Sequence, residues 1–331
     1  RKGPQKMKQK HNLLEERQCF KPFAYPWAYN AWLVHEQRHW GQWEAKLGED
    51  VKDWKKNLTV AEKNLLTHIF RFFTQADIDV AGAYVKNYLP YFPQPEVRMM
   101  LLGFASREAV HIAAYSHLIE TLGLPETTYN EFAQYQEMKE KHEYLLGVSA
   151  TQNTKADTAV HMAVFSGFTE GMQLFSSFIM LLNFSRQGKM RGMKDIITWS
   201  IRDEMMHCDG MTKLFREYVK ENLDIWNDYT KSRIYAAAEK MVELEDKFID
   251  LAFAMGDLVD LTKEEVKVYI RYITDRRLIG LGLKGIFKVK RNPLRWVEEI
   301  INSPIHGNFF ETVVTDYAKG ALTGSWDEVW A

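Results

Sequence analysis

The amino-acid sequence predicts an all-α protein built as one large helical bundle. Hydrophobic residues make up 46% of the 331 residues and aromatic residues 13%, which is ample material for a thick core and argues against disorder. No proline occurs between Pro125 and Pro293, and this run is filled with Ala, Met, Leu, Glu and Lys, which favour helices over short strands. A large helical bundle can absorb the whole length without splitting into separate cores.

The N-terminal section is rich in Trp and Tyr, as in "YPWAYNAWLVHEQRHWGQW". We expect residues 1–55 to form an aromatic-rich collar of extended or short helical segments without a core of its own. Thr59 followed by Glu62 has the spacing of a capping box, which predicts a helix from near residue 60 to about residue 87. The proline-rich stretch "LPYFPQP" then ends this helix.

The remaining helices are separated by stretches of turn residues such as "GLPE", "RQGKMRG" and "MGDLVDLT". Hydrophobic periodicity predicts these helices at roughly 95–123, 128–147, 154–185, 191–221, 226–256 and 263–281. Long helices with short connections imply antiparallel neighbours, so we assign residues 56–290 to one bundle. Residues 291–331 contain glycines and show little periodicity, and we expect a C-terminal segment and flexible tail there.

Charge and composition exclude several classes of protein. The net charge of -1, from 43 basic and 44 acidic residues, gives no electrostatic footprint for nucleic acid or an anionic membrane. Residues 162–184 are long enough to span a bilayer, but a lone carboxylate such as Glu170 would cost about 3 kcal/mol there, so we expect a buried helix instead. Two cysteines, Cys19 and Cys208, cannot form a disulfide framework, and no secretory leader opens the sequence, so we expect a cytoplasmic protein.

The residues that indicate chemistry are pairs of Glu and His three positions apart. On a helix such residues are neighbours and can reach one ion. With 44 acidic residues and 10 His, about one acid-x-x-His pair is expected by chance. The sequence has three with glutamate, namely Glu36/His39, Glu108/His111 and Glu204/His207. The first lies among charged residues of the collar, and we interpret it as structural, whereas the other two lie in long amphipathic helices.

Each of these two helices is preceded by a helix that carries an isolated acid in an apolar setting, Asp77 in "FRFFTQADIDVAG" and Glu170 in "GFTEGMQLF". Two inward carboxylates and two Glu-x-x-His pairs, each from its own helix, form the arrangement that holds two metal ions in a four-helix bundle. Mixed carboxylate and imidazole donors suit iron or manganese. Asp79 is an alternative to Asp77 on another face, and Cys208, beside His207, is a rival ligand that we interpret as a packed core residue.

The sequence also resembles the small, radical-generating subunit of class I ribonucleotide reductase, from about residue 20 to residue 320. The motifs "FFTQAD", "REAVHIAAY", "TEGMQLF", "IRDEMMH", "YIRYITDRRLIGLGL" and "NPLRWV" carry the resemblance. It implies a ferritin-like helical bundle that forms a homodimer. It also implies two metal ions per chain, Fe/Fe first, with Mn/Mn or Mn/Fe as alternatives, held by the residues that spacing selects: Asp77, Glu108, His111, Glu170, Glu204 and His207.

Tyr115 lies one helical turn beyond His111, where spacing alone would predict core packing. The resemblance instead makes Tyr115 the candidate for a stable tyrosyl radical, formed when the reduced metals are oxidised by an oxygen species. Ser200, four residues before Glu204, departs from the large apolar residues that the family often places around the metals. A serine there could admit water or a polar oxidant, so storage of the radical on the metal centre itself stays an alternative.

The resemblance further implies a path for the radical towards a large catalytic subunit, which reduces ribonucleotides to deoxyribonucleotides. Trp40 matches the relay tryptophan, Asp203 the carboxylate along the path, and Tyr317 the tyrosine of a C-terminal tail that binds the large subunit. Trp43 is an alternative to Trp40. The tail residues Trp326 and Trp330 are alternatives to Tyr317.

Taken together, these residues predict the small subunit of a ribonucleoside-diphosphate reductase. A ferritin-like iron storage protein would use a similar ligand set, but such proteins are short single bundles, whereas this chain adds a collar, helices after residue 226 and a tail. A ligand-binding di-metal oxidase is a third candidate. Such an oxidase would not need the path through Trp40, Asp203 and Tyr317.

Overall fold

The structure, a computed structural model, describes residues 12–301, and the predicted all-α class is confirmed because these residues contain helices and no named strand. They fall into two compact units, the first ending at Pro293 and the second beginning at Leu294. The α-helices of the first unit are α1 (Pro26–Glu36), α2 (Gly48–Lys52), α3 (Val60–Ala83), α4 (Pro95–Thr121), α5 (Gln136–Ala150), α6 (Lys155–Met162), α7 (Leu174–Arg186), α8 (Arg191–Glu221), α9 (Asp228–Ala252) and α10 (Lys263–Gly280). The second unit contains α11 (Arg295–Ile301).

Segments with π or 3₁₀ geometry join or extend these α-helices. Those with π geometry are η1 (Asp53–Asn57), η2 (Tyr84–Tyr88) and η5 (Ala163–Gln173). Those with 3₁₀ geometry are η3 (Glu126–Tyr129), η4 (Glu131–Gln134) and η6 (Leu223–Ile225). Because η5 connects α6 to α7 without a break, the three form one continuous rod.

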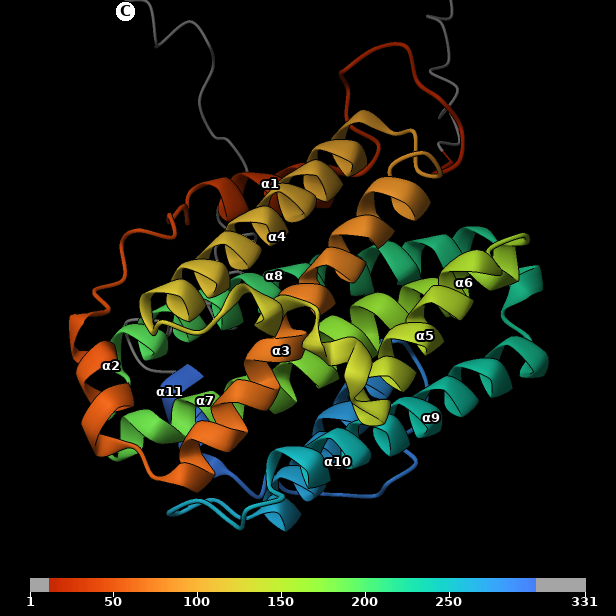
Figure 1. The fold of residues 1–331 in the computed structure, drawn as a ribbon. Coiled ribbons are helices and arrows are strands. Elements are labelled where there is room, and N and C mark those ends of the chain that lie inside the picture. Colours follow the sequence, from red (N-terminus) through yellow and green to blue (C-terminus); the bar gives the residue numbers. More distant parts are fainter. Residues whose placement is uncertain (1–11, 302–331) are drawn as a thin grey trace, which may run out of the picture. The chain divides into compact units, whose positions relative to one another are not determined.

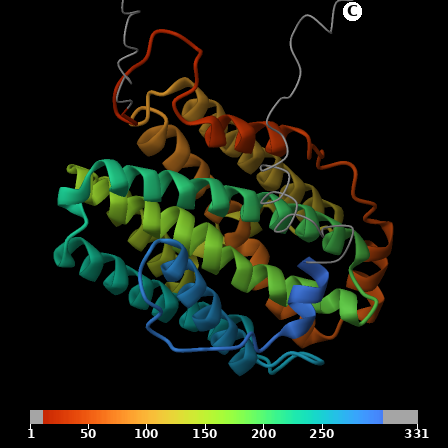
Figure 2. The ribbon, with the colours of Figure 1, turned by 180° about the vertical axis from the view of Figure 1, so that it is seen from behind.

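Four elements of the first unit surround a common core, namely α3, α4, α8 and the rod that contains η5. α3 packs against α4, and α1 lies along α4 (Figure 1). Seen from behind, α8 runs beside the rod of α6, η5 and α7, with α10 next to the same rod (Figure 2). α4 also contacts α8, and α3 also contacts η5 and α7. The side chains that α3, α4, η5 and α8 turn towards one another therefore meet in the interior.

The capping box predicted at the start of α3 is confirmed. Thr59 Oγ1 accepts a hydrogen bond from the Glu62 backbone N–H at 3.2 Å, and Glu62 Oε2 accepts one from the Thr59 N–H at 2.7 Å. These two bonds satisfy N–H groups that the first turn of a helix leaves without intrahelical partners. The helix then continues through η2 to Tyr88, close to the predicted end.

The start of α8 is capped by a side chain from the collar. Met190 at its N-cap has a left-handed φ of 54° and makes no side-chain cap. Instead, Asp50 accepts hydrogen bonds from the N–H groups of Gly192 at 2.8 Å and Met193 at 2.7 Å. A Cβ on Gly192 would lie 2.5 Å from the Lys46 carbonyl oxygen, so only glycine permits this close approach. The collar thus determines where the helix that carries Glu204 and His207 begins.

The helix predicted at 128–147 was wrong at its start. Residues before Gln136 form the two 3₁₀ turns η3 and η4, and α5 begins only there. Tertiary contacts explain the difference, because the Tyr129 hydroxyl lies 2.8 Å from the Ser116 hydroxyl and Arg71 donates to Glu131 at 2.6 Å. These contacts hold the segment against α4 and α3 in a path that a regular helix would not follow.

The apolar stretch 162–184 begins at the last residue of α6 and continues through η5 and α7, and its side chains are buried throughout, as predicted. Within residues 12–301, no helix combines the length and the apolar character needed to cross a bilayer. η5 has the wider π geometry, which Thr169 Oγ1 supports by donating to the Val164 carbonyl at 3.1 Å. A π segment changes the direction of side chains relative to an α-helix and is frequent at functional sites.

Removal of the Asp50 carboxylate should destabilise the first unit. We expect Asp50→Ala to lower the free energy of unfolding by about 2 kcal/mol, because two buried N–H groups of α8 lose a charged acceptor. Urea unfolding followed by circular dichroism measures the effect. Asp50→Asn, which retains one acceptor oxygen, should lose less. An unchanged unfolding midpoint in Asp50→Ala would show that α8 does not need this cap.

Candidate metal centre

Six acidic and imidazole side chains meet in the core between α3, α4, η5 and α8. Each of the six is at most 1% exposed. Each Glu-x-x-His pair projects from one face of its helix, as the spacing requires. α3 contributes Asp77, α4 contributes Glu108 and His111, η5 contributes Glu170, and α8 contributes Glu204 and His207.

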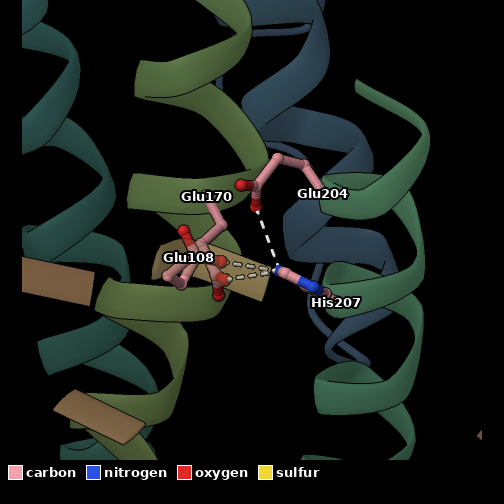
Figure 3. Close-up of side chains that lie close together, drawn as sticks. All are labelled: Glu108, Glu170, Glu204 and His207. Atoms are coloured by element: carbon pink, nitrogen blue, oxygen red, sulfur yellow. Dashed lines mark ion pairs between the residues drawn. The ribbon is translucent and has the colours of Figure 1, made fainter. Parts of the chain in front are cut away.

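The candidate donor atoms form two overlapping groups. Within each group, one donor atom from every residue lies within 4.8 Å of the others. The groups are Asp77, Glu108 and His111 on one side, and Glu108, Glu170, Glu204 and His207 on the other. Glu204 Oε1 also lies 3.2 Å from Nδ1 of His111, which belongs to the first group. Glu108 and Glu204 therefore each lie close to residues of both groups. Figure 3 shows the three carboxylates of the second group gathered at one nitrogen of the His207 ring, Nδ1.

Several of these buried atoms have no hydrogen-bond partner within the part of the chain that the structure describes. They are Asp77 Oδ2, both carboxylate oxygens of Glu108 and of Glu204, and Nδ1 of His111 and of His207. Buried polar atoms are normally hydrogen-bonded, because an unsatisfied one loses its hydration without compensation. Carboxylate oxygens and imidazole nitrogens that converge in this way can bind cations. The donor set, four carboxylates and two imidazoles, is therefore compatible with a dinuclear metal centre.

Burial and mutual repulsion shift the pKa values of two of the carboxyl groups upwards. Burial raises the pKa of Asp77 well above its usual value, and the neighbouring Glu108 adds to this shift. Burial likewise raises the pKa of Glu170 to about 8. In the protein alone these two groups therefore favour their neutral forms, because another negative charge in the apolar core is costly.

Glu108 behaves in the opposite way because two imidazoles lie beside it. Burial raises its pKa, but His111 and His207 outweigh burial and hold the pKa at about 2. Burial lowers the pKa of His111, but the carboxylates of Glu108, Asp203 and Glu204 together outweigh burial and raise it well above the usual value. Without a cation, the site therefore keeps positive charge close to Glu108 by holding protons on its imidazoles.

Tyr115 is 2% exposed and lies beside the first group of donors. Its hydroxyl donates to Ser200 Oγ at 2.8 Å, and the Ser200 hydroxyl in turn donates to the Ile196 carbonyl at 2.9 Å. The Tyr115 and Phe73 ring centroids are 4.2 Å apart. Burial raises the pKa of Tyr115 well above its usual value, with the Asp77 carboxylate as a further cause, so the phenol keeps its proton.

Trp40 and Asp203 form a connected path to His111. Trp40 Nε1 donates to Asp203 Oδ2 at 2.7 Å, and the same oxygen lies 3.1 Å from His111 Nε2. The ring centroids of Trp40 and His111 are 5.8 Å apart. Trp40 is 2% exposed, whereas its rival Trp43 is 72% exposed. Of the two tryptophans, the structure brings Trp40 to the buried site.

Asp79, Cys208 and the Glu36/His39 pair belong to neither of the two donor groups. Asp79 contacts His142 at 2.7 Å on another face of α3. The Cys208 thiol donates to the Ser166 carbonyl at 3.4 Å. The Glu36/His39 pair enters neither group, and His39 Nδ1 lies 3.1 Å from Arg107 instead. Tyr317 lies outside the described residues, as do Trp326 and Trp330.

Sequence reasoning missed three side chains that contact the site. Tyr84 donates to both oxygens of Glu170, at 2.9 and 3.1 Å. His35 Nε2 lies 3.1 Å from His207 Nε2, and Arg107 donates to the Trp40 carbonyl at 3.0 Å. Tyr84 follows Asp77 by seven residues, which places both on one helical face and is a usable signal. His35 carries no such signal, because it comes from α1 and its contact depends on how two distant helices pack.

Comparison with known proteins identifies the family. The family model for "Ribonucleotide reductase, small chain" matches residues 17–293. The probable ribonucleoside-diphosphate reductase small subunit 048L of Invertebrate iridescent virus 3 is 50% identical over 95% of this chain and 88% of its own length. The ribonucleoside-diphosphate reductase subunit beta of Chlamydia pneumoniae is 31% identical over 89% of this chain and 88% of its own length.

Solved structures show the same fold. The ribonucleotide reductase R2 subunit from Clostridium botulinum superposes with a TM-score of 0.78 at 23% identity, covering 83% of this chain and 88% of that chain. The dimanganese(II)-NrdF of Streptococcus sanguinis superposes with a TM-score of 0.68 at 19% identity, covering 83% and 94%. The predicted ferritin-like bundle is thereby confirmed. The chain belongs to the ribonucleotide reductase small-chain family and is a ribonucleoside-diphosphate reductase small subunit.

Proposed function

We propose that this subunit binds two metal ions in its buried donor groups and generates a radical that a large subunit uses to reduce ribonucleotides. The observation that carries the proposal is the convergence of six buried side chains, five of which have at least one ligand atom without a hydrogen-bond partner among residues 12–301. One ion would be held by the group containing Asp77 and His111, and the other by the group containing Glu170 and His207. Glu108 and Glu204 would lie between them.

We propose iron for both positions, with manganese in one or both as the alternative, because the same carboxylates and imidazoles accept either metal. When loaded and then oxidised by an oxygen species, the ions would supply the oxidising power from which the radical arises. The surrounding residues would orient the donors and exclude water, since every candidate ligand is at most 1% exposed. Tyr84 would restrain the Glu170 carboxylate through its two hydrogen-bond contacts.

We propose Tyr115 as the residue that stores the radical. Its burial shields the ring from solvent, and the contact with Phe73 fixes the plane of the ring. The hydrogen bond to Ser200 directs the phenol hydroxyl towards a neutral acceptor, and Ser200 is itself held by the Ile196 carbonyl. This setting supports Tyr115 as a protected radical carrier.

We propose that the radical leaves through Asp203 and Trp40. The hydrogen bond from Trp40 to Asp203 and the contact of Asp203 with His111 give a continuous polar route from the donor groups to the collar. Arg107, which donates to the Trp40 carbonyl, would hold the tryptophan in place. The homodimer, the tail residue Tyr317 and binding of the large subunit through the tail are further parts of this proposal, implied by the family.

The first prediction concerns metal content. The metal-free chain should bind two Fe(II) or Mn(II) ions under anaerobic conditions, and Glu108→Ala should lose tight binding of both, because Glu108 belongs to both donor groups. Equilibrium dialysis with metal analysis measures the stoichiometry. Glu120→Ala, at an exposed glutamate of the same helix, α4, is the matched control and should still bind two ions. Full binding by Glu108→Ala would disprove the proposed ligand set.

The second prediction concerns the radical carrier. After loading with metal and exposure to an oxygen species, the protein should give a tyrosyl signal in electron paramagnetic resonance that is absent from Tyr115→Phe. Tyr88→Phe, which removes another buried tyrosine hydroxyl, one that contacts His161, should retain the signal. If Tyr115→Phe keeps both the tyrosyl signal and activity, another tyrosine is the carrier. If the wild type is active without any tyrosyl signal, the metal centre itself stores the radical.

The third prediction concerns the relay. Trp40→Phe should lower ribonucleotide reduction by the complex with the large subunit by about a hundredfold, because the phenyl ring cannot donate to Asp203. Two ions should still bind and the tyrosyl signal should persist. The exposed Trp43→Phe serves as control and should leave activity unchanged. Equal losses in both variants would mean that the collar acts only in folding or docking.

A further inference from the structure

His35, on α1, contacts the outer nitrogen of His207. Its side chain is 1% exposed, and its Nε2 lies 3.1 Å from His207 Nε2. The other nitrogen of the His207 ring, Nδ1, faces the carboxylates and lies 2.9 Å from Glu108 Oε1. His207 therefore turns one nitrogen towards the donor groups and the other towards His35.

The short distance between the two Nε2 atoms requires one proton between them. An imidazole that binds a metal through Nδ1 carries its proton on Nε2. The facing Nε2 of His35 must then be an acceptor, which places the proton of His35 on Nδ1. His35 is then a neutral ring whose free Nε2 lone pair faces the Nε2 of His207.

The packing of α1 on α4 holds the His35 ring in this position. A Cβ on Gly103 of α4 would lie 3.1 Å from the Trp32 ring and 3.5 Å from His35 Nδ1, so glycine allows the two helices to approach closely. The Phe104 ring centroid is 5.2 Å from that of His35 and 4.5 Å from that of His207. Phe104 thus contacts both imidazoles and keeps their planes fixed.

Glu36 gives the outer nitrogen of His35 an anionic neighbour. Glu36 Oε1 lies 3.8 Å from His35 Nδ1, and its side chain is 45% exposed. A carboxylate on this side favours the tautomer of His35 with its proton on Nδ1. The Glu36/His39 pair therefore lies next to the centre although it contributes to neither donor group, since Glu36 faces His35 and His39 faces Arg107.

The two candidate imidazole ligands differ in their outer contacts. His111 Nε2 lies 3.1 Å from the Asp203 carboxylate, whereas His207 Nε2 faces the neutral ring of His35. A charged acceptor makes an imidazole a stronger donor to a metal than a neutral acceptor does. The two positions of the centre are for this reason chemically different.

We propose that His35 is a positioning residue that accepts the Nε2 proton of His207 and thereby sets the affinity of the metal position formed by Glu108, Glu170, Glu204 and His207. This inference rests on the proposed dinuclear centre. α1 supplies none of the candidate ligands, but through His35 it would control the metal affinity of one of the two positions. Loss of His35 should therefore affect one ion and spare the other.

The test compares His35→Phe, which keeps a ring but has no acceptor, with His35→Gln, whose side-chain oxygen can accept. Metal-free protein is titrated with Mn(II) under anaerobic conditions, and the ions bound per chain are counted by equilibrium dialysis. We expect His35→Phe to weaken one of the two ions by about 10- to 100-fold and to retain the other. His35→Gln should recover most of that loss. The control is His68→Phe, which replaces a buried histidine of α3 and should bind both ions as the wild type does.

Two outcomes would overturn the proposal while the dinuclear centre stands. One is wild-type affinity for both ions in His35→Phe. The other is an equal loss in the Phe and Gln variants, both shown to be folded by circular dichroism, which would indicate packing instead of hydrogen bonding. A wild-type chain that binds fewer than two ions would overturn the dinuclear centre and this inference with it.

Discussion

The burial of four carboxylates and two imidazoles in one apolar core is the constraint on which the rest of the structure depends. Charges removed from water are costly unless opposite charge lies close by. In the protein alone, Asp77 and Glu170 favour their neutral forms, and His111 provides positive charge beside Glu108. A pair of divalent cations would replace these protons. The buried carboxylates would destabilise a core without cations, but they suit a core that binds two metal ions.

The elements around the centre serve to hold these donors in place. Asp50 of the collar caps α8, which carries Glu204 and His207. The π geometry of η5 lies where Glu170 projects from the apolar rod, and Tyr84 of η2 donates to its carboxylate. Structural elements far apart in the sequence thus act on the same few side chains, and the stability of the bundle and the geometry of the centre are linked.

The collar has two roles that its composition did not reveal. It caps the helix that carries Glu204 and His207, and it supplies side chains that contact both candidate imidazole ligands from outside. Trp40 reaches His111 through Asp203, and His35 contacts His207 directly. Both tryptophan and histidine are amphipathic rings, so they can fill an apolar interface while donating or accepting one directed hydrogen bond. An aromatic-rich segment is well suited to surround a buried polar centre.

The sequence by itself determined the helical class, most helix boundaries and which six donors could share one site, because helical spacing places residues three or four apart on one face. It did not determine that residues 128–135 would form 3₁₀ turns, since their contacts with Ser116 and Arg71 are made across the fold. Nor did it reveal His35, whose contact with His207 joins residues 172 positions apart and depends on the close approach that Gly103 permits. Local periodicity determines which way a side chain points, and only the packing of whole helices decides what it contacts.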